Sequence, residues 1–340
     1  MNSDYSLLHI ISHTDLDGVA AAALAWRAHH HSGVPIRVSL TGYGEVDNSI
    51  LESIKSGCRM VVLDLSPQFQ TTVDEIDRTF LPGGTPFLFD HHKSMYEKYA
   101  NRPWIVADTA YCGAMVYWNW LSDGNADGET LRSIEPLRGI VRVANDRDLW
   151  INEDPDGRLW QAMVTLCGEW GAFARLVSNP SAVLTESERA AVTGFVCRQE
   201  ERFKRAKEHL SKDRAGKRGD FLFLGDGFLE FGDTSDFCGL LLDRPEQSPP
   251  VLVALAYKKA GGGWAVSLRS RNGLAGRVVS LLKDGRKIRG GGHGDAAALY
   301  FPNNYSEGGI RESISAALSA ESESASGMGV TLGDLIKGAM

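Results

Sequence analysis

The sequence contains few cysteines, and none of them are paired in a motif. Five cysteines occur among 340 residues, without a Cys-x-x-Cys pair of the kind that zinc and redox sites use. No run of about 18 apolar residues is present to span a bilayer. The start, Met1-Asn2-Ser3-Asp4, lacks the basic residues and apolar core of a signal peptide. These absences predict a cytoplasmic protein with reduced thiols and no membrane partner.

An excess of basic charge is also missing. The formal net charge is −7 at pH 7, whereas a protein that coats long nucleic acid normally presents a broad basic face. A small substrate held in a local basic pocket remains compatible with this charge. With 340 residues, the chain is long enough for two domains, each with its own core.

The sequence does contain short apolar strands that end in ionisable side chains. The first strand, residues 7–12, leads into His13-Thr14-Asp15-Leu16-Asp17-Gly18 and then into an Ala-rich helix, residues 19–30. A second strand ends at Asp64, and a third ends in Asp90-His91-His92. Strands alternate with helical stretches over this part of the chain, which predicts an α/β fold with a doubly wound, mostly parallel sheet.

In such a sheet the carboxyl ends of the strands line one edge, where ligands bind. We therefore expect these ionisable side chains to converge there. Each has a simpler interpretation when taken alone, because Asp17 can cap a helix N-terminus and Asp90-His91-His92 can form a surface loop. Capping alone does not explain why an imidazole and two carboxylates alternate after the first strand.

A fourth apolar stretch, residues 137–144, leads to Asn145-Asp146-Arg147-Asp148. Asp146 lies nearer the apolar stretch and is our preferred site residue, with Asp148 as the alternative. Carboxylates with a minority of imidazoles and no thiolate suit manganese or magnesium. Because so many carboxylates at one edge repel one another, we expect two divalent ions between them. Two ions can bridge and deprotonate a water molecule and neutralise charge during in-line phosphoryl displacement.

The second half of the chain predicts a smaller α/β domain with an anion site. Residues 264–271 alternate like a strand and place Arg269 and Arg271 on one face. Gly290-Gly291-Gly292 precedes His293, and backbone N–H groups at glycines can approach a phosphate closely. A tight turn is the alternative explanation of the glycines. With two forked arginine side chains nearby, a phosphate clamp is favoured.

These motifs together resemble the DHH phosphoesterase family with its associated C-terminal substrate-binding domain. The matching segments are His13-Thr14-Asp15-Leu16-Asp17-Gly18, Val62-Leu63-Asp64, Asp90-His91-His92, Asn145-Asp146, Arg269-Ser270-Arg271 and Gly290-Gly291-Gly292-His293. They occur in family order across most of the chain. The resemblance implies a DHH catalytic domain at residues 1–184, a linker helix and hinge at 185–219, a substrate-binding domain at 220–320 and a mobile tail at 321–340.

The resemblance also implies roles for individual residues. One ion would be bound by His13, Asp15 and Asp64, and the other by Asp17, Asp64, His91 and Asp146. Asp90 and His92 would be catalytic, Asp90 by orienting a ligating imidazole and His92 by binding a phosphate oxygen or assisting the leaving group. Arg269, Arg271, Gly291, Gly292 and His293 would bind substrate. Several family members have three residues between the first histidine and the first aspartate, whereas only Thr14 intervenes here.

The short first motif and the Gly-Gly-Gly-His segment are most similar to the nanoRNase branch, which uses manganese. We therefore expect hydrolysis of short single-stranded oligonucleotides to mononucleotides, with Tyr111 and Trp150 as candidates to stack on a base. The alternatives are a phosphatase of 3′-phosphoadenosine 5′-phosphate, a cyclic dinucleotide phosphodiesterase, a polyphosphatase or pyrophosphatase, and a silent nucleotide-binding module. The sequence leaves a homodimer open.

Overall fold

The computed structural model describes residues 6–214, 219–242, 249–271, 273–283, 287–292 and 294–325. It divides the chain into two compact units, Met1–Val196 and Cys197–Met340. The helix α9 (Glu186–Glu208) begins in the first unit and ends in the second. Among the described helices, none combines the length and the hydropathy that a membrane span requires.

The first unit is built on a sheet of five parallel strands in the order β2-β1-β3-β4-β5. The strands are β1 (Leu8–Ser12), β2 (Ile36–Leu40), β3 (Arg59–Leu63), β4 (Leu88–Asp90) and β5 (Ile105–Ala107). Its helices are α1 (Leu16–His29), α2 (Val46–Ser56), α3 (Gln70–Thr79), α4 (Lys93–Tyr99), α5 (Gly113–Trp120), α6 (Gly128–Ile134), α7 (Arg138–Asp148) and α8 (Gly157–Ser178). The predicted doubly wound parallel sheet is confirmed.

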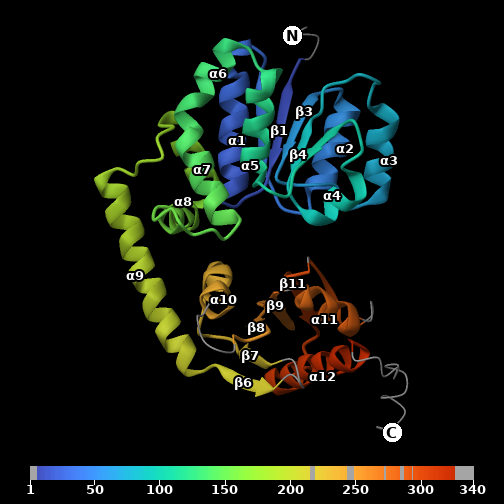
Figure 1. Cartoon of the computed structure of the whole chain (residues 1–340), viewed down its shortest axis with the longest axis vertical. Helices are drawn as coiled ribbons and strands as arrows, with labels where there is room; N and C mark the ends of the chain where they lie inside the picture. The colour runs from blue at the N-terminus through green and yellow to red at the C-terminus, as the bar shows by residue number, and fades with distance from the viewer. Residues whose placement is uncertain are drawn as a thin grey trace. The chain divides into compact units, whose positions relative to one another are not determined.

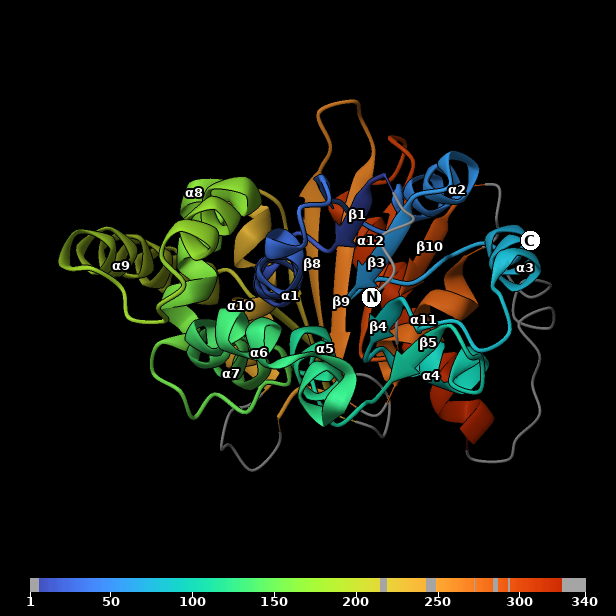
Figure 2. The same ribbon diagram turned by 90° about the horizontal axis from the view of Figure 1, so that it is seen from above.

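Helices cover both faces of this sheet (Figures 1 and 2). Seen from above, α1 and α5 lie on one side of the row of strands, and α2, α3 and α4 lie on the other. Alternate strand residues supply the two cores: Ile10 packs with α1, α5, α7 and α8, whereas Ile11 packs with α2 and α3. The Ala-rich α1 is buried almost all round, as expected for a helix in the centre of a large core.

The second unit contains a mixed six-stranded sheet in the order β10-β11-β9-β8-β7-β6. Its strands are β6 (Ser211–Arg214), β7 (Asp220–Leu224), β8 (Leu252–Lys258), β9 (Trp264–Ser270), β10 (Arg289–Gly292) and β11 (Ala296–Phe301). Its helices are α10 (Thr234–Leu242), α11 (Leu274–Leu282) and α12 (Glu307–Ala325). One core packs α11 and α12 against the sheet, and a second core packs α10 and the end of α9 against its other face.

The apolar stretch at residues 137–144 begins at the last residue of a short 3₁₀ helix, Leu137, and continues into the helix α7. The structure differs from the sequence-based expectations at two places. Ser211–Arg214 lies within the expected linker and hinge at 185–219 but forms an edge strand of the second sheet, and charged residues such as its own are common on exposed edges. The helix α12 continues to Ala325, into the segment expected to be a mobile tail, and residues 326–340 lie outside the described residues.

Candidate metal centre

The ionisable side chains predicted from the strand ends come together at the carboxyl edge of the first sheet. His13 follows β1, Asp64 follows β3, and Asp90 ends β4 with His91 next to it. These three strands are neighbours and run parallel, so their carboxyl ends lie side by side. The predicted convergence is therefore present in the structure.

Two of the carboxylates also hold helices in place. Asp15 is the N-cap of α1 and accepts a hydrogen bond from the Gly18 N–H at 3.0 Å. Asp17 accepts hydrogen bonds from the first amides of α5, Gly113 N–H at 2.6 Å and Ala114 N–H at 2.9 Å. Each carboxylate retains further lone pairs, so capping does not prevent it from binding a cation. Capping and ligand binding are thus compatible roles for these residues.

Glycines allow the chain to pack this tightly around the carboxylates. A Cβ atom at Gly18 would lie 2.4 Å from the His13 carbonyl oxygen. A Cβ atom at Gly113 would lie 2.8 Å from the Asp64 Cβ and 3.1 Å from the Asp17 Oδ2. Asp64 itself has a φ of 54°, a conformation that costs free energy for a residue other than glycine and is found where function needs a particular side-chain direction.

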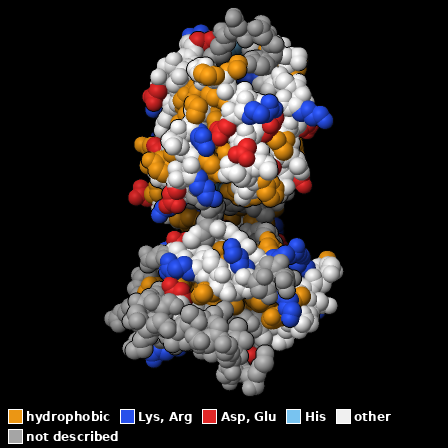
Figure 3. Space-filling view, turned by 90° about the vertical axis from the view of Figure 1, so that its right-hand side faces the viewer, with side chains coloured by type: hydrophobic (Ala, Val, Ile, Leu, Met, Phe, Trp, Pro, Cys, Tyr) orange, Lys and Arg blue, Asp and Glu red, His pale blue; other side chains and the backbone are white. Residues whose placement is uncertain are grey.

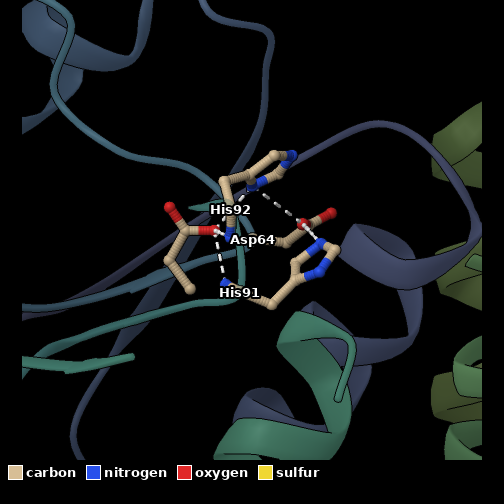
Figure 4. Close-up of side chains that lie close together, drawn as sticks. Asp64, His91 and His92 are labelled. Carbon is tan, nitrogen blue, oxygen red and sulfur yellow. Dashed lines mark hydrogen bonds and ion pairs between the residues drawn. The ribbon is translucent and has the colours of Figure 1, made fainter. Parts of the chain in front are cut away.

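The two adjacent histidines have different surroundings (Figure 4). The carboxylate of Asp64 lies between their rings, 3.3 Å from His91 Nε2 and 4.0 Å from His92 Nδ1. Asp90 Oδ1 lies 2.7 Å from His92 Nδ1 and also accepts the backbone N–H groups of both histidines. Asp90 therefore orients the His92 ring, and it contacts His91 through the backbone alone.

His92 was expected to keep a nitrogen available for a phosphate group, and the structure corrects this expectation. Its Nε2 is hydrogen-bonded to the Tyr43 hydroxyl at 2.8 Å, while Nδ1 is held by Asp90. The Tyr43 ring also lies against the His13 ring, with centroids 5.6 Å apart. Sequence analysis missed Tyr43 because it lies in the loop between β2 and α2, outside every motif.

Asp148 takes the place predicted for Asp146. Asp148 Oδ2 lies 3.4 Å from His91 Nε2. Both Asp146 oxygens instead accept backbone N–H groups of the following loop, from Glu153 at 3.0 Å and Asp154 at 3.1 Å. The helical geometry of α7 explains the difference, since Asp148 shares a face with the buried Val141 seven residues earlier, whereas Asp146 does not.

Three groups of donor atoms within the described residues are close enough to bind metal ions, with all atoms of a group within 4.8 Å of one another. They are His13, Asp15 and Asp64; Asp17, His91 and Asp148; and Asp64, Asp90, His91 and His92. Asp64 occurs in two groups and His91 in two, so the groups adjoin. The described side chains therefore form adjoining donor groups that could bind metal.

The electrostatics of the cluster favour bound cations. Burial, and then the neighbouring Asp17 and Asp15, raise the pKa of Asp64 well above its ordinary value. Burial and the same two neighbours also raise the pKa of Asp148. Burial lowers the pKa of His91, so its imidazole is mainly neutral and able to bind a metal. Carboxylates that resist ionisation because of one another are stabilised by a divalent ion between them.

Asp15 differs from the other carboxylates. Burial alone would raise its pKa, but His13 at 2.8 Å reverses the effect and lowers the pKa of Asp15 below its ordinary value. The pKa of His13 is correspondingly raised, because Asp15 outweighs the opposing effect of burial. The raised pKa of His13 and the lowered pKa of Asp15 favour an ion pair between the two side chains, and metal binding by His13 would require its neutral form.

The donor set fits a hard divalent cation. It consists of carboxylate oxygens and imidazole nitrogens, which manganese and magnesium accept. Cys112 is close to Asp17, but burial raises the pKa of its thiol well above the usual value, so no thiolate is available. Asp90 Oδ2 is buried with no hydrogen-bond partner among the described residues, which is costly for a carboxylate unless a cation or water is nearby.

The predicted substrate-binding residues lie in the second unit. Arg269 is in β9, and its guanidinium donates hydrogen bonds to Ser267 Oγ and the Leu268 carbonyl. Gly291 and Gly292 are exposed residues of β10, and Arg271 is exposed just beyond the end of β9. The strand register pairs Arg269 with Ala296 and Gly292 with Ala297 across β11, so Arg269 and Gly292 lie at the same end of the sheet. His293 lies outside the described residues.

Solved structures share this architecture at low sequence identity. No protein-family model matches the chain, and no curated protein matches it in sequence. A structure of the exonuclease RecJ bound to manganese matches with a TM-score of 0.57 and 13% identity, over 92% of this chain and 90% of that one. The DHH domain of a protein described as a member of a family of ribosomal proteins matches with a TM-score of 0.55 and 15% identity, over 92% of this chain and 86% of that one.

RecJ from Thermus thermophilus in complex with Mn²⁺ also matches, with a TM-score of 0.53 and 14% identity, over 92% of this chain and 52% of that one. These identities are low enough that the matches bear on the fold alone. The order of the motifs in the sequence had predicted this same fold. The chain has the fold of the DHH-family proteins.

Proposed function

We propose that the protein is a metal-dependent phosphoesterase that hydrolyses the phosphodiester bonds of short oligonucleotides to mononucleotides. The observation that carries the proposal is the position of Asp64, whose carboxylate adjoins both the His13–Asp15 pair and the two histidines after β4. A carboxylate that belongs to two donor groups can bind two neighbouring ions. RecJ has been solved with Mn²⁺, which supports manganese as the ion, with magnesium as the alternative.

In this proposal one ion would be held by His13, Asp15 and Asp64, and the second by Asp17, Asp64, His91 and Asp148. Such ions lower the pKa of water and neutralise charge on the attacking and leaving oxygens. The protein holds each ligand in a fixed direction: α1 and α5 fix Asp15 and Asp17, and the backbone at Asp64 fixes its carboxylate.

His92 is proposed to hold a proton near the leaving group. Its ring is fixed by Asp90 at Nδ1, and Tyr43 lies at Nε2. Burial lowers the pKa of His92, but Asp90 outweighs this effect, and the net pKa is raised above the ordinary value. A raised pKa keeps the imidazole protonated nearer neutral pH, which suits assistance to the leaving group through the Tyr43 hydroxyl at Nε2.

Aromatic and charged side chains favour a short substrate that carries bases. Trp150, two residues beyond Asp148, is 36% exposed, and Tyr111, two residues before Gly113, is 40% exposed. Exposed rings next to site residues can stack on a base. On the face of the first unit that Figure 3 shows, basic and acidic side chains are interspersed, whereas a long strand would need a broad basic surface. Arg269, Arg271, Gly291, Gly292 and His293 are proposed to bind substrate phosphates.

Product analysis tests this function. Purified protein with Mn²⁺ would receive, in competition, a di- to pentaribonucleotide series, a long single strand, 3′-phosphoadenosine 5′-phosphate, a cyclic dinucleotide and polyphosphate. We expect preferential loss of the short oligonucleotides and release of mononucleotides. Consumption of only the bisphosphate, the cyclic dinucleotide or polyphosphate would keep the metal centre and refute the proposed substrate. Binding without turnover of any substrate would indicate a nucleotide-binding module.

Asp64→Asn provides the matched test of the metal centre. It preserves side-chain volume and removes the shared charge, so turnover should be abolished. Asp47→Asn is the control, because Asp47 is another buried carboxylate of the first unit whose oxygens accept the backbone N–H groups of Gln68 and Phe69. Turnover that survives in Asp64→Asn would contradict the two-ion assignment.

A further inference from the structure

A cavity of about 470 Å³ lies in the first unit at the amino edge of the sheet, opposite the candidate metal centre. Its walls are the first residues of β3, the segment before β4, and the last turns of α1, α2, α3 and α5. Figure 1 labels these helices and strands. In an open α/β sheet, all of these parts lie at the edge away from the carboxyl ends of the strands. This volume falls within the range of small-molecule sites, roughly 300–1,000 Å³.

One charged side chain lines this cavity. Arg59, the first residue of β3, is the only Lys, Arg, Asp or Glu among its described lining residues. The Arg59 guanidinium has no ion pair or hydrogen bond with any residue that the structure describes. His29 also lines the cavity, but burial, and then the charge of Arg59, lower its pKa to about 4, so it is neutral. A half-buried, unpaired guanidinium in a wall whose described residues include no carboxylate is matched by an anion.

Aromatic rings form much of the remaining wall. Tyr117 and Trp120 lie nearly parallel, with centroids 6.1 Å apart, and Phe89 packs against both. The Tyr117 hydroxyl is 3.2 Å from His29 Nε2, so the polar group of this ring already has a partner. A second cavity of about 260 Å³ also includes His29, Arg59 and Trp120 in its lining, so the two cavities adjoin at these residues.

We propose that this cavity is a second ligand site that binds a planar organic anion, an aromatic ring that carries a carboxylate or a phosphate. Arg59 binds the anionic group, and Trp120 with the neighbouring rings contacts the planar part. The helix C-termini nearby carry partial negative charge, which opposes an anion. The last carbonyls of α2 and α3, however, accept N–H groups from Gly57, Cys58 and Phe80, so their effect is reduced.

The proposal does not depend on the function of the metal centre. Among the described residues, the cavity shares no lining residue with the three donor groups. Binding there can therefore be measured without Mn²⁺ and without turnover.

Isothermal titration calorimetry of the full chain in EDTA tests the site. The probes are indole-3-acetate, phenyl phosphate, adenosine 5′-monophosphate and inorganic phosphate, with the neutral indole-3-acetamide for comparison. We expect at least one anion to bind and the amide to bind at least tenfold more weakly. Tighter binding of the carboxylate or of a phosphate distinguishes the two anion classes.

Arg59→Gln should weaken anion binding by about tenfold to a hundredfold, as the loss of hydrogen bonds to a charged group predicts. Arg37→Gln is the matched control, because Arg37 lies near the start of β2 in the same sheet, pairs with the exposed Glu52 and does not line the cavity. The Arg37→Gln variant should bind the anions with unchanged affinity. Trp120→Leu should weaken the aromatic anions and leave inorganic phosphate unaffected.

Circular dichroism melting of each variant establishes that it is folded, so a loss of binding is not confused with unfolding. The proposal is overturned if no anion binds, if the amide binds as tightly as the acid, or if Arg59→Gln and Arg37→Gln have equal effects.

Discussion

Replacing Asp148 by Asn removes one negative charge from the most crowded part of the metal centre while keeping the size of the side chain. Donor atoms of Asp17, His91 and Asp148 lie within 4.8 Å of one another. Two unit charges at that separation repel by about 3.5 kcal/mol at an effective dielectric constant of about 20. The Asp148 side chain is 26% exposed, and solvent screening reduces this repulsion to about 2–3 kcal/mol.

We therefore expect Asp148→Asn to raise the free energy of unfolding of the metal-free protein, and to remove its response to metal. At pH 8 in EDTA the melting temperature of the first unit should rise by about 5–10 °C, because about 1 kcal/mol shifts a domain of this size by roughly 2–4 °C. Saturating Mn²⁺ should stabilise the wild-type protein and have little effect on the variant. Both effects are measurable by calorimetry or circular dichroism, without a substrate.

Asp146→Asn is the control, two residues away on the same helix. An amide has one oxygen where the carboxylate accepts two backbone N–H groups, so this variant should lose about 1–3 kcal/mol of stability. It should still be stabilised by Mn²⁺. The assignment of Asp148 is refuted if Asp146→Asn loses the metal response and Asp148→Asn keeps it, or if Asp148→Asn destabilises the metal-free protein.

Three further variants test other parts of the first unit. Tyr43→Phe removes the hydroxyl from His92 Nε2 and should lower kcat by about tenfold to a hundredfold while the melting temperature stays within a few degrees; an unchanged kcat would exclude a role for this contact. Gly113→Ala forces a methyl group against Asp64. The loss in the free energy of Mn²⁺ binding should exceed the loss in the free energy of unfolding, and titration calorimetry and thermal melting of the same sample measure the two. His9→Gln changes the pH dependence of stability. Burial lowers the pKa of His9 from 6.5 to about 4, so the unfolded chain binds a proton that the folded chain does not. The contribution to stability is present above pH 6.5 and falls by about 3 kcal/mol as the pH drops to 4. Denaturant titrations from pH 4 to 7 should show that the free energy of unfolding depends less steeply on pH in the variant than in the wild-type protein. The same pH dependence in both proteins would contradict this account.

The parts of the fold and the site that could be predicted from sequence are those fixed by local patterns. The strands β1, β3 and β4 are apolar runs that end in polar motifs, and topology then forces His13, Asp64 and His91 together. Thr185 and Glu188 show the capping-box spacing, and the structure has both reciprocal hydrogen bonds at the start of α9. In these cases residues that are close in sequence determine where the strand or helix ends and which side chains lie there.

Other features depend on contacts between distant segments. The N-terminus of α5 has no cap of its own, because Asp17, 96 residues earlier, accepts its first N–H group. Tyr43 reaches His92 from a loop. Asp148, by contrast, could have been preferred from the sequence, because a period of 3.6 over residues 138–148 places it on the buried face of a helix. Asp146 was preferred instead because it lies nearer the apolar stretch, and Asp148 was kept as the alternative.

The capping by Asp15 and Asp17 has a consequence for how related sequences are interpreted. A lineage that lost catalysis would still need both residues to hold α1 and α5, so selection for folding alone can retain the first motif. Asp64 and Asp148 have no such duty among the described hydrogen bonds, and Asp64 adds a strained backbone. In a divergent relative, Asp64 and Asp148 are therefore the positions that report on the metal centre. A relative that keeps the first motif but has replaced both residues would retain the fold without a working metal centre.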